Sequence, residues 1–358
     1  MTVSAEDEIT IHNAEEEIVM EKPAIRGDSV IFDFQTFDAG FRAVLRQDSL
    51  VGEFVIHYAD NYRLPFVAVA GQSYRFADPT TAATTDFSGK YAVQFFNEKS
   101  TVSAMGLITQ QGSVAKGTFL TPTGDYRYLE GNVIGDTLWL SAFDGNHLFV
   151  FNAVRQGDTL RGTQWLGRAR NRPWLGVRDD NAQPPSSESL TYLKEGYDRL
   201  SFSFPDTDSS LVSLDDPRFR DKVVIVQILG SWCPNCLDET RFMVDWYARN
   251  RDRGVEVIGL AYEQKADFTY ASGRVKKMIA KLGVPYPVLI AGTSDPQQAS
   301  TTLPALNQVI GFPTTIFIGR DGRVAAIHTG FSGPGTGIYY DQMIEQFDQQ
   351  VNALLAAP

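Results

Sequence analysis

Two patterns of hydrophobic and polar positions divide the chain. In the first half, apolar residues alternate with polar ones in short runs, such as residues 30–34, 138–140 and 148–151, and Gly, Asp and Asn punctuate the turns between them. Alternation with a period of two is typical of antiparallel strands that bury one face. In the second half, longer apolar runs alternate with stretches of helical period. The pattern therefore predicts an antiparallel all-β domain followed by an α/β domain.

The β domain repeats itself. The recurrence of short motifs in the same order predicts two copies of one meander of strands, which pack as a β-sandwich or close into a barrel. We favour a barrel over residues 1–167, because closure removes exposed strand edges. The recurring Asp and Gly residues are interpreted as turn formers rather than ligands. The motifs Gly27-Asp28-Ser29, Phe37-Asp38 and Asp48-Ser49-Leu50-Val51-Gly52 recur as Gly135-Asp136-Thr137, Phe143-Asp144 and Asp158-Thr159-Leu160-Arg161-Gly162.

The second domain begins after a stretch that has no apolar period. Residues 168–188 are rich in Arg, Asp, Asn, Pro and Ser and are predicted to be a linker. The domain that follows, residues 189–358, alternates strands and helices, which indicates a partly parallel, buried sheet. Its predicted strands are residues 201–204, 223–229, 255–261, 316–318 and 323–329, and its predicted helices are residues 189–200, 234–250, 265–282 and 338–355.

An insertion over residues 284–310 interrupts this alternation. It contains an extra apolar stretch at residues 287–291 and a short helical piece at residues 303–307. A glycine-rich loop at residues 330–337 then precedes the last helix, and Thr336 is a candidate N-cap for that helix. The loop lacks the Lys of a phosphate-binding loop, so nucleotide binding is not predicted.

The two cysteines of this 358-residue chain lie in one motif, Trp232-Cys233-Pro234-Asn235-Cys236. The motif lies at the junction of the predicted strand over residues 223–229 and the predicted helix over residues 234–250. Unpaired N–H groups and the helix dipole favour a thiolate at such a helix start, so Cys233 is the predicted nucleophile. Cys236 is less than one helical turn away and can attack a mixed disulfide formed on Cys233. The pair is therefore predicted to cycle between dithiol and disulfide.

Other roles fit this pair less well. A structural disulfide would need an oxidising compartment, and its loop is too short to restrict the unfolded chain much. Half of a zinc site would need two more ligands, and the four histidines, His12, His57, His147 and His328, show no ligand-like spacing. A bound metal is therefore not predicted.

From about residue 200 to residue 355 the sequence resembles the thioredoxin superfamily, and within it the TlpA/ResA-like thiol–disulfide oxidoreductases. Residues 232–236 match the Trp-Cys-x-x-Cys signature, and Glu239 matches the Glu that this branch carries three residues after the second cysteine. The resemblance implies a thioredoxin-like fold. A carboxylate one turn from Cys236 lies on the same helix face and could accept the proton of the resolving thiol. A solvated glutamate near a helix start is the alternative interpretation.

A second matched motif is Gly311-Phe312-Pro313-Thr314-Thr315. The resemblance implies that Pro313 is cis and packs beside the cysteines, which leaves the backbone of Phe312 free to pair with an incoming peptide. Together with Trp232 and Pro234, these residues would shape the substrate groove. An ordinary trans proline at the start of a strand is the alternative.

Comparison with thioredoxins and with peroxiredoxins bears on which residue accepts the proton and on whether the protein is a peroxidase. Thioredoxins carry a buried Asp where this chain has Gln227, and a neutral amide cannot act as that proton acceptor, which shifts the role to Glu239. Peroxiredoxins share the general fold but place a Pro and a Thr or Ser where this chain has Val226 and Gly230. A thiol peroxidase that uses Cys233 thus loses its main support, although it remains an alternative.

Composition and charge exclude further classes. The chain has 32 basic and 43 acidic residues and a net charge of −11, which disfavours nucleic acid or an anionic membrane as a partner. Its 43% hydrophobic content suffices for two cores, and no apolar run approaches the ~18 residues of a membrane span.

The expected location follows from the resemblance, because TlpA/ResA-like proteins act outside the cytoplasmic membrane. We therefore expect the cell envelope or periplasm. Residues 1–8 contain neither a basic region nor an apolar core, so they are not a signal peptide, and taken alone they indicate the cytoplasm. Our hypothesis is that the native chain starts upstream of Met1 with an export signal.

These observations together predict a thiol–disulfide oxidoreductase that reduces the disulfides of exported proteins. Cys233 attacks the substrate, Cys236 resolves the mixed disulfide and Glu239 handles the proton. No bound cofactor is expected, and the expected partners are protein disulfide substrates and an upstream thiol electron donor. The thiol peroxidase is the second hypothesis. In a third hypothesis, the main function is the binding of a ligand or protein by the β domain, and the redox domain acts as a switch.

Overall fold

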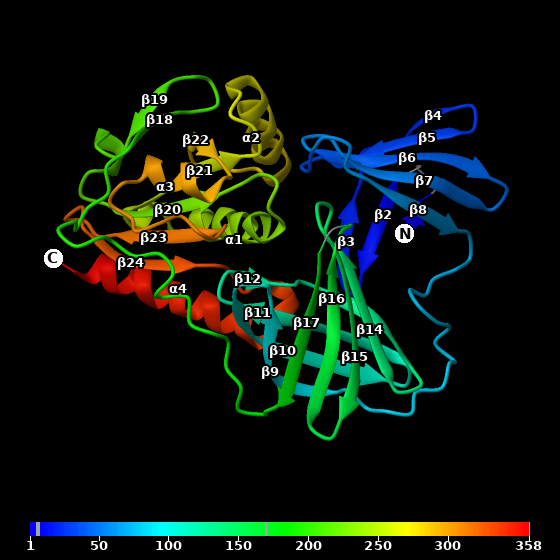
Figure 1. Cartoon of the computed structure of the whole chain (residues 1–358). Coiled ribbons are helices and arrows are strands. Elements are labelled where there is room, and N and C mark those ends of the chain that lie inside the picture. The colour runs from blue at the N-terminus through cyan, green and yellow to red at the C-terminus, as the bar shows by residue number, and fades with distance from the viewer. Residues whose placement is uncertain (5–7, 169, 358) are drawn as a thin grey trace. The chain divides into compact units, whose positions relative to one another are not determined.

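The computed structural model describes residues 1–4, 8–168 and 170–357 (Figure 1). Its contacts divide the chain into two compact units. The first comprises Met1–Thr121 with Tyr126–Pro185, and the second comprises Pro122–Asp125 with Ser186–Pro358. The first unit is built from strands and the second from strands and helices, so the predicted order of an all-β region before an α/β region is confirmed.

Eight antiparallel strands of the β region close into a barrel. They follow one another around the ring in the order β10-β9-β17-β16-β15-β14-β13-β11, and the pairing of β10 with β11 closes it, while the short β12 lies beside β11. The bounds are β9 (Gly89–Phe96), β10 (Thr101–Gln111), β11 (Val114–Thr121), β12 (Gly124–Asp125), β13 (Leu129–Ile134), β14 (Thr137–Phe143), β15 (Leu148–Gln156), β16 (Thr159–Leu166) and β17 (Arg170–Arg178).

Strict alternation fills the barrel with side chains. In β9, Tyr91, Val93 and Phe95 are buried while the residues between them are exposed. Aromatic rings then pack across the interior, with the ring centroids of Phe119 and Phe151 4.9 Å apart and those of Phe95 and Phe119 5.4 Å apart. Since an eight-stranded barrel is just wide enough for side chains to fill, this interior is a packed core.

The two copies of the sequence repeat form different sheets. Strands β13–β17 of the second copy belong to the barrel, whereas the first copy is an open five-stranded sheet, β4-β5-β6-β7-β8. The predicted barrel is thus confirmed, but it is completed by β9–β11, and the expectation that the two copies pack together in it is wrong. The remaining bounds are β1 (Thr2–Val3), β2 (Ile9–Asn13), β3 (Glu16–Val19), β4 (Ala24–Arg26), β5 (Ser29–Asp33), β6 (Ala39–Arg46), β7 (Ser49–Ile56) and β8 (Arg63–Val69).

The repeated motifs lie at equivalent turns of the two meanders. Gly27, with φ 63°, begins the two-residue turn between β4 and β5, and Gly135, with φ 61°, begins the turn between β13 and β14. Glycine adopts such a positive φ without steric cost, and an Asp follows it in both turns. The interpretation of these residues as turn formers is therefore supported by the backbone.

Strand β17 corrects the predicted linker. Residues 170–178 pair with β16 on one side and β9 on the other, so a barrel strand occupies much of the range 168–188. Trp174 is 2% exposed and packs into the barrel core. Arg172, a charged residue on the same face as Trp174, and Pro173 between them hid the alternation: the Arg172 guanidinium lies 4.6 Å from the centre of the buried Phe95 ring. Only pairing with the distant β9 makes this segment a strand.

A five-stranded mixed sheet, β22-β21-β20-β23-β24, organises the second unit. The central β20 (Val223–Leu229) pairs in parallel with β21 and antiparallel with β23. All of its residues are buried, as in a strand that is covered on both faces. The other bounds are β18 (Ser203–Pro205), β19 (Leu211–Ser213), β21 (Val255–Glu263), β22 (Val288–Thr293), β23 (Thr314–Ile318) and β24 (Val324–Thr329).

The helices cover this sheet. Phe347 of α4 packs against Phe242 and Trp246 of α1, with both ring-centroid distances 5.0 Å. The face of β20 that carries Val224, Val226 and Ile228 belongs to a hydrophobic cluster. This cluster also includes Phe202 and Leu306. Within the described residues, no helix is long and apolar enough to cross a membrane. The bounds are α1 (Pro234–Asn250), α2 (Phe268–Leu282), α3 (Pro296–Thr302) and α4 (Ile338–Ala356), with 3₁₀ turns at Pro217–Phe219, Arg251–Arg253 and Pro334–Thr336.

Three local predictions in this unit are wrong. Residues 189–200 form turns rather than a helix, and residues 303–307 follow α3 instead of forming one. Asp295 starts α3 earlier, because its carboxylate accepts a hydrogen bond from the Gln298 N–H at 2.9 Å. Thr336 donates its hydroxyl to the Gly333 carbonyl, and the residue that caps α4 is Gly337.

Candidate active site

Cys233 lies at the junction of β20 and α1, as the sequence predicted. Its Sγ accepts a hydrogen bond from the Cys236 N–H at 3.3 Å, so the side chain caps the N-terminus of α1. On its other side the thiol meets the carbonyl oxygen of Phe312 at 3.5 Å. Cys233 is 6% exposed, whereas Cys236 is fully buried, which makes Cys233 the sulfur that a substrate can reach.

Cys236 is the more deeply buried of the two thiols. Burial raises its pKa well above the usual range of a cysteine, and the neighbouring Cys233 sulfur and the Glu239 charge raise it further. Both thiols are free in this structure. Because Cys236 keeps its proton at neutral pH, its attack on a mixed disulfide requires a base.

Glu239 is a buried carboxyl one turn along α1 from Cys236, and its side chain is 3% exposed. Burial raises the pKa of this carboxyl to about 7, although hydrogen bonds from Thr315 and Gln227 act in the opposite direction. The solvated-surface alternative is therefore wrong. A carboxyl that titrates near neutral pH can accept a proton and release it again.

Two polar residues hold the Glu239 carboxyl in place. The Gln227 amide donates to one oxygen at 2.8 Å, and the Thr315 hydroxyl donates to the other at 2.6 Å. In the sequence alone, Gln227 is only a departure from thioredoxin, and Thr315 has no predicted role beyond its place in the matched motif. The available signal was the single polar residue of β20 and the two threonines that begin the otherwise apolar β23.

The residues predicted to form the substrate groove surround Cys233. The Phe312–Pro313 peptide bond is cis, as the resemblance implied. The rings of Phe312 and Trp232 pack edge to face with centroids 5.6 Å apart, and Pro234 is the buried first residue of α1. These four residues place aromatic surface and a backbone carbonyl beside the sulfur of Cys233.

A second buried carboxylate escaped the sequence analysis. Glu263, at the end of β21, is 1% exposed and accepts hydrogen bonds from the Ser231 N–H and hydroxyl, both at 2.8 Å. The indole N–H of Trp232 donates to the adjacent Tyr262 carbonyl at 2.8 Å. The end of β21 therefore fixes the turn that leads into Cys233. Glu263 followed a long apolar run, which was its only signal.

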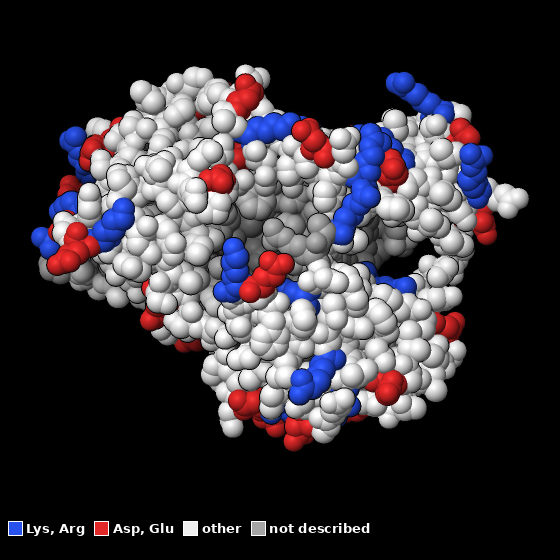
Figure 2. All heavy atoms as spheres, viewed as in Figure 1, with Lys and Arg blue, Asp and Glu red and all other residues white. Residues whose placement is uncertain are grey.

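No metal-binding group of three or more His, Cys, Asp or Glu side chains occurs among the described residues. On the face shown in Figure 2, basic and acidic side chains are interspersed over the surface. This distribution agrees with the net charge of −11 in giving no basic stripe on that face for a nucleic acid.

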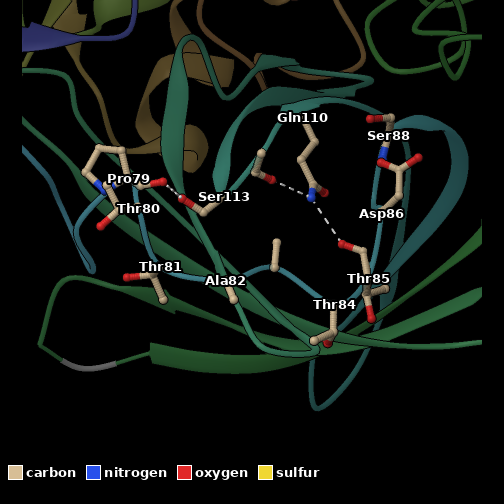
Figure 3. Close-up of a pocket in the computed structure, with 12 residues that line it drawn as sticks. Pro79, Thr80, Thr81, Ala82, Thr84, Thr85, Asp86, Ser88, Gln110 and Ser113 are labelled. Carbon is tan, nitrogen blue, oxygen red and sulfur yellow. Dashed lines mark hydrogen bonds between the residues drawn. The ribbon is translucent and has the colours of Figure 1, made fainter.

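A pocket of about 660 Å³ lies in the β unit, beside the loop over residues 79–88 (Figure 3). Its polar side chains are used to hold the loop. The Gln110 amide donates to the Thr85 and Gly112 carbonyls at 3.1 and 2.9 Å, and the Ser113 hydroxyl donates to the Pro79 carbonyl at 2.7 Å. This pocket therefore presents no reactive group comparable to the cysteine pair.

Comparisons with known proteins agree with this geometry. The Redoxin family model matches residues 194–343. Thiol-disulfide oxidoreductase ResA of Bacillus subtilis is 26% identical over 156 residues, which is 44% of this chain and 77% of ResA. Protein DipZ of Mycobacterium tuberculosis is 34% identical over 77 residues, which is 22% of this chain and 11% of DipZ.

Among solved structures, a putative thiol:disulfide interchange protein DsbE from Chlorobium tepidum covers 46% of this chain and 100% of its own, with a TM-score of 0.35 and 24% identity. The barrel strands lie outside the matched family range. Over residues 194–343, where the Redoxin match includes the Cys233–Cys236 pair and a cis proline, the chain is similar to the TlpA/ResA-like branch of the thioredoxin superfamily, and it is an oxidoreductase by type.

Proposed function

We propose that this protein is a thiol–disulfide oxidoreductase that reduces protein disulfides by cycling Cys233 and Cys236. The observation that carries the proposal is the order of burial at the site. The reachable sulfur of Cys233 caps a helix, the buried thiol of Cys236 lies behind it, and the Glu239 carboxyl titrates near neutral pH. This arrangement supplies a nucleophile, a resolving thiol and a base in sequence.

The proposed cycle balances in two steps. The Cys233 thiolate attacks a substrate disulfide, which forms a Cys233–substrate bond and releases one substrate thiolate. Cys236 then loses its proton to Glu239 and attacks Cys233, which forms the intramolecular disulfide and releases the second substrate thiolate. Two electrons pass to the substrate, and an upstream thiol donor must return two electrons to the protein.

An equilibrium redox titration tests this direction of electron flow. We expect a reversible two-electron transition of the Cys233–Cys236 pair below about −250 mV, which is the reducing end of the range of known dithiols. The fluorescence of Trp232 in defined thiol–disulfide buffers provides the readout, and a Cys233→Ser variant provides the control. A transition near about −120 mV would identify an oxidant instead, and no transition at all would reject the proposed cycle.

We further propose that the protein acts outside the cytoplasmic membrane on exported proteins. The support for this location is the resemblance to TlpA/ResA-like proteins, which as a family are expected to act there. Fractionation of cells that express the native gene, with thiol-trapping before lysis, should recover the protein in the envelope fraction with Cys233 and Cys236 reduced. Recovery with cytoplasmic markers would contradict the proposed location but not the redox activity.

A further inference from the structure

A pocket of about 170 Å³ reaches the Glu239 carboxyl from the side of α4. Thr315 and Phe317 of β23, Ala326 of β24 and Phe347 of α4 contribute to its walls. Glu239 itself is 3% exposed, but other residues that line the same pocket, including His328 and Gln346, are exposed. The pocket therefore runs from the protein surface to a carboxyl that is otherwise sealed in the core.

The opposite side of the site offers no such opening during the reaction. Cys236 is fully buried, and Cys233 is 6% exposed, with its Sγ 3.5 Å from the carbonyl oxygen of Phe312. When Cys236 attacks, Cys233 is already bonded to the substrate, which covers the groove. A proton taken up by Glu239 at that moment needs a different way out.

The charges around the pocket suit transfer of a proton. Glu239 acts electrostatically on Cys236 and on Tyr286, and the mouth of the pocket carries Glu188 and His328. Partial desolvation lowers the pKa of the exposed His328 imidazole and the charge of Glu188 partly opposes this, so His328 adds no positive charge to the mouth at neutral pH. No Lys or Arg is among the residues described as lining the pocket.

We propose that this pocket is the route by which Glu239 exchanges its proton with solvent while the substrate occupies the cysteine side. This inference rests on the proposed role of Glu239 as the base. Water takes about 30 Å³ per molecule, so the pocket has room for several molecules between the carboxyl and the mouth. In the resolving step the proton passes from Cys236 to Glu239, and the pocket then returns it to solvent as the substrate thiolate leaves.

The first test measures access and needs no activity. In the full chain carrying Cys233→Ser and Cys236→Ser, a Glu239→Cys substitution places the sole thiol at the inner end of the pocket. We expect this thiol to react with methyl methanethiosulfonate in the folded protein. Adding Ala326→Leu, which fills the wall of the pocket, should slow the reaction at least about tenfold.

Ala325→Leu is the matched control, because Ala325 is the exposed neighbour on β24 and does not line the pocket. Equal labelling of the Ala326→Leu and Ala325→Leu proteins, or no labelling without either substitution, would overturn the route. Should Ala326→Leu fail to fold, Gln346→Trp at the exposed mouth replaces it, with Gln349→Trp on the outer side of α4 as its control.

The second test measures the proton itself. Glu239→Ala removes the base. We expect small carboxylates such as formate to raise the rate of the resolving step in this variant about tenfold. Ala326→Leu should abolish this rescue and Ala325→Leu should retain it. Rescue that is indifferent to Ala326→Leu would overturn the route. If formate fails to rescue Glu239→Ala itself while the labelling behaves as expected, the error lies in the assumed role of Glu239, which separates the two failures.

Discussion

Replacing Cys236 with serine will trap the protein as a mixed disulfide with its substrate through Cys233. The serine hydroxyl cannot attack the Cys233–substrate bond, so turnover falls by on the order of 10³-fold or more while the first step proceeds. Cys233→Ser removes the reachable sulfur and should abolish both turnover and adduct. The two variants therefore lose activity equally but differ in the covalent product.

Intact-protein mass spectrometry after incubation with a disulfide-bonded peptide measures this difference. The expected adduct on the Cys236→Ser protein corresponds to one peptide thiol and disappears on addition of dithiothreitol. Because Cys236 is fully buried, thermal unfolding of both serine variants provides the control for folding. An adduct that forms on the Cys233→Ser protein would reverse the assignment of nucleophile and resolving thiol.

Glu239→Gln should slow the resolving step by about 10²-fold at pH 8, since the amide cannot accept the Cys236 proton. In the unsubstituted protein the rate of this step rises with pH through about 7, the pKa of Glu239, and then levels off. In the Glu239→Gln protein that rise disappears, and activity returns only at alkaline pH, where Cys236 loses its proton directly. Single-turnover fluorescence of Trp232 across the pH range measures both profiles.

Thr315→Val should shift the pH profile of the resolving step without lowering its maximal rate. The Thr315 hydroxyl donates to the Glu239 carboxylate at 2.6 Å and thereby lowers the pKa of the carboxyl. Without that bond, the midpoint of the pH profile should move to higher pH while the activity above the midpoint is retained. A Glu239→Gln profile that still rises near pH 7 would show that another group is the base.

The titration of Glu239 also makes the free energy of unfolding depend on pH. The pKa of Glu239 is raised from 4.5 to about 7, so between these values the native state holds a proton that the unfolded state releases. The free energy of unfolding therefore falls as pH rises through this window, by roughly 3 kcal/mol in total. Urea unfolding of the reduced proteins at pH 5 and pH 8 should show this decrease, and Glu239→Gln should remove it.

The redox centre was predictable because its signals are local. The apolar run Val223–Leu229 and the helix Pro234–Asn250 lie where the sequence placed them, since a buried strand and a capped helix both show in adjacent residues. The position of Cys233 at their junction followed from those two elements alone. The Gly-Asp turns of the β region were predictable for the same reason.

Segments whose structure depends on distant partners were not predictable. Residues 170–178 become a strand because β9 and β16 pair with them, and residues 189–200 remain irregular although their pattern resembled a helix. The first copy of the repeat stays open while the second is closed by β9–β11, although both copies carry the same turn motifs. Non-local pairing decides such outcomes, and it leaves no periodic trace in a single segment.

The sequence by itself determined the candidates for nucleophile, resolving thiol and base, because Cys233, Cys236 and Glu239 lie within two turns at the start of one helix. Only the tertiary structure decided what that base can do. Burial raises the pKa of Glu239 to about 7, although hydrogen bonds from Gln227 of β20 and Thr315 of β23 lower it. The pocket formed with β24 and α4 connects the carboxyl to the surface, because desolvation and access depend on which elements pack around a residue.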